Sequence, residues 1–170
     1  MDTEQISDIF NYLQNKIAVH KGLSVFAKER SKFEGWLKVE LTNYFAENGY
    51  SVIPEKEHID IVVNNRIAIE LKTVNTSYKG NESELKNKTR PITLNIEEII
   101  KDIRSLKNNS YSEKYVLFIV FPLDLKKHES KWNIHLIKIN DKLPNKKLES
   151  QEIEFENKLK GVIYIGDCSK

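Results

Sequence analysis

The chain has 170 residues, of which 39% are hydrophobic and 31% charged, and this suits one compact globular domain spanning residues 1–170. A net charge of +2 permits a nucleic-acid partner but is too small to indicate one. A single cysteine excludes an internal disulfide, and the lack of a long apolar run excludes a signal peptide or membrane span, so we expect a cytoplasmic protein with no membrane partner.

The first part of the chain has the apolar spacing of helices. Asp2 to Val19 is predicted to be an amphipathic helix with Ile6, Ile9, Phe10, Leu13 and Ile17 on its apolar face. After a break at Lys21-Gly22, a second helix is predicted from about Phe26 to Glu47, because Asn48-Gly49 is a good C-terminal signal.

The middle of the chain predicts three strands. Tyr50 to Ile53 has the pattern of a short strand that Pro54 ends. Two β-branched runs follow, Ile59–Val63 and Ile67–Thr73, and the short polar segment 64–66 between them is typical of a hairpin.

The rest of the chain predicts a loop, a helix and three further strands. The polar segment from Asn75 to Thr93 is predicted to be a long loop, and Asn95 with Glu98 has the pattern of a capping box at the start of a helix. Segment 141–160 is charged and gives no clear prediction. The strands are predicted at Lys114–Phe121, Trp132–Ile139 and Gly161–Ile165. Together these elements indicate an α/β fold with a mixed, twisted central sheet flanked by helices.

Three charged residues interrupt the apolar strands of the predicted hairpin. Asp60 lies within the first strand, and Glu70 and Lys72 lie within the second. A charge in a buried strand costs several kcal/mol unless it is paired or metal-bound. These three residues are therefore candidates for a functional site, and the competing interpretation is a structural ion-pair cluster on an exposed sheet face.

The register of the hairpin decides whether the two carboxylates meet. With a two-residue loop, Glu70 and Lys72 face away from Asp60. With a three-residue loop, Val63 pairs with Ile67, so that one face is wholly aliphatic and Asp60 lies opposite Glu70. Because register is selected by which face can be buried, we predict the three-residue loop, or a two-residue loop with a compensating bulge.

Two facing carboxylates predict a cation between them. All-oxygen ligands favour Mg²⁺ or Mn²⁺ over zinc. Lys72 shares the face and is predicted to position a metal-bound water or to stabilise charge on a phosphate. Glu40 is a further candidate, because it falls within the apolar stripe of the second helix, while Glu34 and Lys38 lie towards the margin of that stripe. The competing interpretation is that Glu40 extends out of the stripe to solvent or pairs with a basic residue.

This order of residues resembles the PD-(D/E)XK nuclease superfamily, over about residues 28–122. The family pattern is a helix with a glutamate, a strand with an aspartate, a Glu-x-Lys strand, then a helix and a strand. The matching residues here are Glu40, Asp60, Glu70-Leu71-Lys72, the helix from Ile96 and the strand from Lys114, with Ile59 where the motif often has proline.

The resemblance implies a restriction-endonuclease-like fold and a Mg²⁺- or Mn²⁺-dependent endonuclease acting on duplex or branched DNA. It divides the chain into an N-terminal helix (1–20), a nuclease core (26–122) and C-terminal strands and connections (123–170). It implies that Asp60, Glu70, Glu40 and the Leu71 carbonyl hold the metal. The small size favours a homodimer or a subunit of a larger assembly.

Two other interpretations are open. One is a structural protein whose charged face is merely solvated and which binds neither metal nor nucleic acid. The other is a catalytically inactive module with the same fold, which binds nucleic acid or a protein partner. Basic residues in the long loop and the following helix are predicted to contact a nucleic-acid backbone, although a solvated surface explains them equally well. These residues are Lys79, Lys86, Lys88, Arg90, Lys101 and Arg104.

Overall fold

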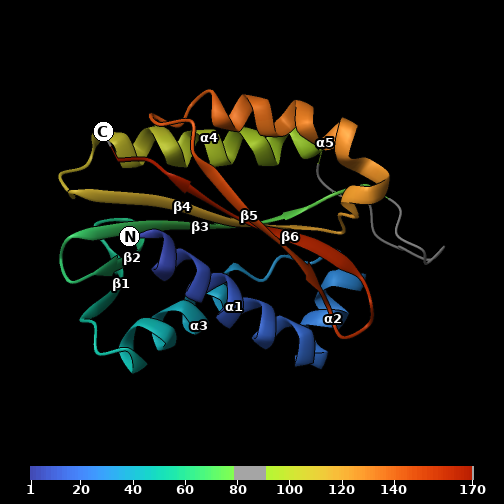
Figure 1. Cartoon of the computed structure of the whole chain (residues 1–170), viewed down its shortest axis with the longest axis horizontal. Coiled ribbons are helices and arrows are strands. Elements are labelled where there is room, and N and C mark those ends of the chain that lie inside the picture. Colours follow the sequence, from blue (N-terminus) through green and yellow to red (C-terminus); the bar gives the residue numbers. More distant parts are fainter. Residues whose placement is uncertain (79–90, 170) are drawn as a thin grey trace.

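The computed structural model describes residues 1–78 and 91–169, in which a central sheet lies between two layers of helices (Figure 1). No helix of this part of the chain is long and apolar enough to cross a membrane. The elements follow in the order α1 (Thr3–Val19), α2 (Lys21–Lys28), α3 (Glu34–Glu47), β1 (Val52–Lys56), β2 (Ile59–Val63), β3 (Ile67–Asn75), α4 (Ile92–Asn108), β4 (Glu113–Phe121), α5 (Leu125–Asn140), β5 (Leu148–Glu154) and β6 (Lys160–Asp167).

The sheet has six strands in the order β1-β2-β3-β4-β6-β5. β3 and β4 are parallel, and all other neighbouring strands are antiparallel. The connection between the two parallel strands contains α4, since parallel neighbours require a crossover. The chain is therefore an α/β protein with a mixed sheet, which confirms the predicted fold class at this level.

Helices cover both faces of the sheet. α1, α2 and α3 lie below the sheet in Figure 1, and α4 and α5 lie above it. Because successive strand residues point to opposite faces, β4 sends Leu117 and Ile119 to the first layer and Val116 and Phe118 to the second. The central strands are thus buried on both faces, which explains their continuous apolar sequences.

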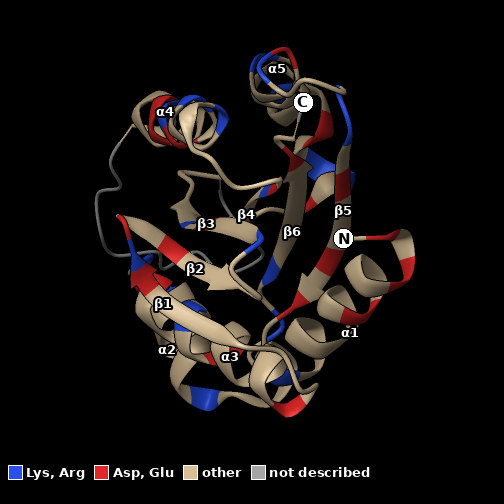
Figure 2. Cartoon of the chain, turned by 90° about the vertical axis from the view of Figure 1, so that its left-hand side faces the viewer, with Lys and Arg blue, Asp and Glu red and all other residues tan. Residues whose placement is uncertain are grey.

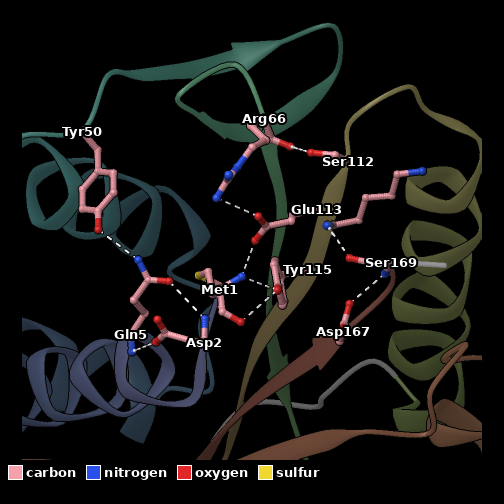
Figure 3. Close-up of polar contacts among 11 residues, drawn as sticks. Met1, Asp2, Gln5, Tyr50, Arg66, Ser112, Glu113, Tyr115, Asp167 and Ser169 are labelled. Atoms are coloured by element: carbon pink, nitrogen blue, oxygen red, sulfur yellow. Dashed lines mark hydrogen bonds and ion pairs between the residues drawn. The ribbon is translucent and has the colours of Figure 1, made fainter.

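The start of α1 is anchored to one end of the sheet (Figure 3). The Met1 amino group forms an ion pair with the Glu113 carboxylate and a hydrogen bond with the Tyr115 hydroxyl. Arg66, the last residue of the β2–β3 hairpin loop, contacts the same Glu113 carboxylate at 2.8 Å. Gln5 donates to the Tyr50 hydroxyl (3.0 Å), so this cluster joins α1, the hairpin and β4.

The predicted first helix and the predicted hairpin register are both confirmed. The five apolar residues predicted for the first helix are the buried residues of α1. In the hairpin, Val63 pairs with Ile67, so the loop has three residues. Asn64 and Asn65 adopt left-handed backbone conformations there, with φ of 50° and 51°, which asparagine tolerates better than most residues.

The predicted helix over residues 26–47 is wrong at its beginning, because two helices occupy this region. α2 begins at Lys21, where His20 Nδ1 accepts a hydrogen bond from the Leu23 N–H (3.2 Å) and caps the first turn. The chain leaves helical geometry at Arg30, whose φ is 55°. The His20 cap therefore sets the boundary, and Gly22 lies inside a helix.

Three other boundaries differ from the prediction. β1 continues through Pro54, because an edge strand tolerates a residue without an N–H. β3 continues to Asn75, where it still pairs with β4. The predicted capping box is wrong, because α4 already begins at Ile92 and the Asn95 side chain donates to the Asn75 carbonyl (3.2 Å).

The predicted strand at Trp132–Ile139 is wrong, because this segment lies in α5. Its buried residues, Trp132 and Ile139, are two helical turns apart, while Ile134 and Ile137 are 58% and 62% exposed. The edge of the sheet is formed instead by β5, within the charged segment 141–160. The predicted strands that became β4 and β6 are confirmed.

Candidate active site

β2 and β3 bring the two predicted carboxylates together. Asp60 and Glu70 each lie one residue beyond the last β2–β3 pair, Ile61–Ile69, and their carboxyl groups are close enough to interact. Glu70 and Lys72 lie on the sheet face that α4 covers, whereas Asp60 contacts Lys38 of α3, from the other layer of helices. The Glu70 residue is only 8% exposed and the Asp60 side chain is 21% exposed, so the pair is partly shielded from water.

The two strands diverge next to this pair, which leaves backbone N–H groups of β3 without a partner on β2. Side-chain carboxylates accept hydrogen bonds from these N–H groups. Ladder pairing between β2 and β3 ends at Ile61–Ile69. Beyond that point the Leu71 N–H donates to Asp60 Oδ2 (2.9 Å), and the Thr73 N–H donates to Glu34 Oε1 (3.1 Å). Asp60 and Glu34 therefore replace a strand partner along the open edge of β3.

Lys38 of α3 supplies the positive charge nearest to Asp60. Its Nζ lies 2.7 Å from Asp60 Oδ1 and 2.8 Å from Glu55 Oε1. Burial raises the pKa of Asp60, but hydrogen bonds from Lys38 and from the Leu71 N–H outweigh it and leave this pKa below its ordinary value. Asp60 is therefore ionised at neutral pH.

Glu70 has the opposite character. Burial and, after it, the hydrogen bond with Asp60 and the charge of Asp60 raise the pKa of Glu70 to about 8. At neutral pH Glu70 therefore holds the proton of the carboxyl pair. The two acids therefore differ in the direction of their pKa shifts, at the place where the sequence predicts a cation.

Lys72 lies on the same face, two residues after Glu70, and pairs with α4. Its Nζ is 3.2 Å from Asp102 Oδ2. Burial lowers the pKa of Lys72, but the charges of Asp102 and Glu34 outweigh it, so the pKa is raised and the ammonium persists. Burial in turn raises the pKa of Asp102, against the effect of Lys72.

Glu40 is placed elsewhere by its contacts. Its Oε2 accepts a hydrogen bond from the Tyr12 hydroxyl (3.0 Å) and lies 3.7 Å from Lys16 Nζ, both on α1. α3 is covered on two sides, by the sheet along Leu37 and by α1 along the flank that carries Glu40. The apolar stripe in the sequence combines these two sides, which is why Glu40 appears to point at the site. Its contacts give the metal-ligand prediction no support.

The predicted basic contacts with nucleic acid are divided between two parts of the chain. Lys101 and Arg104 are exposed on α4, on either side of Asp102 in the sequence. The other four lie outside the described residues, namely Lys79, Lys86, Lys88 and Arg90.

Three residues from the helices surround the carboxyl pair, and none of them was predicted to belong to the site. Lys38 and Glu34 come from α3 and Asp102 comes from α4, and Figure 2 shows these helices on opposite sides of β2 and β3. Asp102 carries a usable signal, because it lies among the apolar residues of the helix stripe. Glu34 and Lys38 are four residues apart and so share a helix face, but nothing in the sequence indicates which strand that face meets.

The oxygen atoms at the site suit a hard divalent ion. Asp60 and Glu70 offer carboxylate oxygens, and the Leu71 carbonyl faces the same side of β3 as its N–H, which points at Asp60. Within the described residues, no group of three or more His, Cys, Asp or Glu side chains is arranged to hold a metal. A bound Mg²⁺ or Mn²⁺ would therefore depend on the two carboxylates, the carbonyl and water.

Comparisons of this chain with protein-family models, curated proteins and solved structures found no match. The function is therefore inferred from the geometry and chemistry of the site.

Proposed function

We propose that this protein is a Mg²⁺- or Mn²⁺-dependent nuclease of the PD-(D/E)XK type, with a restriction-endonuclease-like fold, that hydrolyses phosphodiester bonds in DNA. The placement of three residues carries the proposal. Asp60 and Glu70 come together from adjacent strands, and Lys72 lies two residues after Glu70, on the same face of β3. Such a pair of carboxyl groups is costly as a structural feature, and a divalent ion between them would offset the cost.

In this proposal the site residues have two roles, metal binding and positioning of the reacting groups. Asp60, the Leu71 carbonyl and the deprotonated Glu70 would hold the ion. A bound Mg²⁺ would supply a water of lowered pKa and offset charge on the phosphate. Lys72 positions the attacking water or stabilises the charge that develops on the phosphate, and Asp102 holds the Lys72 ammonium in place from 3.2 Å.

DNA is the proposed substrate, in duplex or branched form. Lys101 and Arg104 support this choice, because they are exposed on α4, the helix that supplies Asp102, and two such cations can contact phosphates beside the site. A homodimer or a larger assembly would allow both strands of a duplex to be cut. Glu40 is left out of the proposed ligand set because its contacts are with α1.

A cleavage assay tests the proposal directly. Purified protein is incubated with Mg²⁺ or Mn²⁺ and with linear duplex, branched and single-stranded DNA. We expect cleavage of at least one substrate, with a loss of at least about 100-fold in Glu70→Gln and in Lys72→Met, because each removes a group that acts on the reacting atoms. Glu149→Gln, on the edge strand β5, is the control and should keep wild-type activity. No cleavage of any substrate by the folded wild-type protein would refute the enzyme proposal.

One observation favours a second candidate, a catalytically inactive module that binds nucleic acid or a protein. The charged groups are already paired without a metal, Asp60 with Lys38 and Lys72 with Asp102. This candidate predicts DNA affinity that falls with salt, but neither metal binding nor cleavage. Calorimetric titration with Ca²⁺, which binds oxygen ligands and often does not support hydrolysis, separates the two candidates.

A further inference from the structure

The ammonium of Lys38 occupies the position of a cation at the carboxyl pair. Its contact with Asp60 Oδ1, at 2.7 Å, is the shortest ion pair at the site, and the Lys38 side chain is only 22% exposed. A charge held this close to Asp60 repels a second cation at the same carboxylate, and the repulsion is strong where water is largely excluded.

We propose that Lys38 is the resident counter-ion of Asp60 and that a divalent metal must displace it, so that Lys38 sets the metal affinity of the site. This inference rests on the proposed function, because it assumes that the carboxyl pair binds a metal. Lys38 thus has a role at the site although it lies on α3, outside the two strands that carry Asp60 and Glu70.

The structure gives the displaced ammonium a second partner. Glu55 Oε1 lies 2.8 Å from Lys38 Nζ, and the Glu55 side chain is 74% exposed. The Lys38 ammonium can therefore move away from Asp60 and still keep a negatively charged partner, because Glu55 lies on the solvent side. Removal of Glu55 should tie Lys38 more tightly to Asp60.

This arrangement predicts that metal and substrate bind cooperatively. In the free protein, Lys38 competes with the metal for Asp60. A phosphodiester near the site is a further anion that can accept the displaced ammonium, and it attracts the metal at the same time. Substrate would then favour metal loading, and by reciprocity metal would favour substrate binding.

The test is the affinity for Ca²⁺ alone, measured by calorimetry on the full chain. We expect Lys38→Met to bind Ca²⁺ at least about tenfold more tightly than wild type, because the competing charge is gone. Lys38→Arg keeps the charge and should stay close to wild type. Lys147→Met is the matched control, because it removes a lysine that pairs at 2.9 Å with Glu149 far from Asp60, and it should change nothing.

Glu55→Gln provides a second, opposite readout at a residue whose side chain is 74% exposed. It should weaken Ca²⁺ binding in the wild-type background and have a smaller effect in the Lys38→Met background, since Glu55 acts through Lys38. Unchanged or weaker binding by folded Lys38→Met overturns the inference while the metal site stands. If Lys38→Met does not fold, unchanged binding by Glu55→Gln overturns it. If neither wild type nor any variant binds Ca²⁺, the proposed metal site itself fails.

Discussion

Asp60 and Glu70 have similar side chains but opposite protonation behaviour at the same site. The difference comes from their partners. Asp60 accepts hydrogen bonds from the Lys38 ammonium and the Leu71 N–H, both of which favour its charged form. Glu70 is buried beside an acid that is already ionised, so its charged form is disfavoured. The pair carries about one negative charge at neutral pH, balanced by Lys38.

This difference predicts how stability depends on pH without metal. The pKa of Glu70 is raised from 4.5 to about 8 on folding, so between these values the folded protein holds a proton that the unfolded chain has released. The stabilisation is complete below pH 4.5 and is lost as pH rises through about 8. Each pKa unit corresponds to about 1.4 kcal/mol, so the expected loss is a few kcal/mol. Asp60, whose pKa is lowered, contributes only at more acidic pH.

Urea unfolding in chelator at pH 5.5, 7 and 8.5 measures this loss. Glu70→Gln should flatten the decline, because glutamine does not titrate. Glu149→Gln, on the surface of β5, should keep the wild-type slope. Equal slopes for wild type and Glu70→Gln would mean that Glu70 titrates normally in the folded protein.

Among the secondary-structure elements, the β2–β3 hairpin was predictable from local sequence, and helix α5 was not. The β2–β3 register follows from the segregation of apolar and charged residues, and the structure confirms it at the Val63–Ile67 pair. The strand prediction at Trp132–Ile139 is wrong because it relied on local alternation of apolar residues. The residues that α5 buries have helical spacing instead. The break between α2 and α3 depends on the His20 cap and on the backbone at Arg30, which carry weak sequence signals.

Because α5 is a helix, substitutions at Trp132 and Ile134 should differ in their effect on stability. Trp132 is fully buried and donates from Nε1 to the Tyr164 hydroxyl (2.7 Å), so Trp132→Ala should cost about 3–5 kcal/mol of unfolding free energy. Ile134 is 58% exposed, so Ile134→Ala should cost less than about 0.5 kcal/mol. In a strand both residues would share one face. Comparable losses in urea unfolding would therefore contradict the helix.

At the scale of the whole molecule, the site lies where three separate parts of the chain meet. The hairpin brings Asp60 and Glu70 together, α3 brings Lys38 and Glu34 from one side, and α4 brings Asp102 from the other (Figure 2). The carboxyl pair was predictable because it depends on one local hairpin. Its partners were not predictable, because they depend on how distant helices dock. Glu40 was wrongly assigned to the predicted site because it lies at an interface between α1 and α3, which the sequence does not reveal.

The proposed function requires that Asp60 and Glu70 together hold one divalent ion. Calorimetric titration with Mn²⁺ at pH 7, repeated in buffers of different ionisation enthalpy, measures this binding and the protons that it releases. We expect one ion per chain, release of about one proton per ion because Glu70 must ionise, and loss of binding in both Asp60→Asn and Glu70→Gln. An absence of binding, or binding that neither substitution weakens, would contradict it.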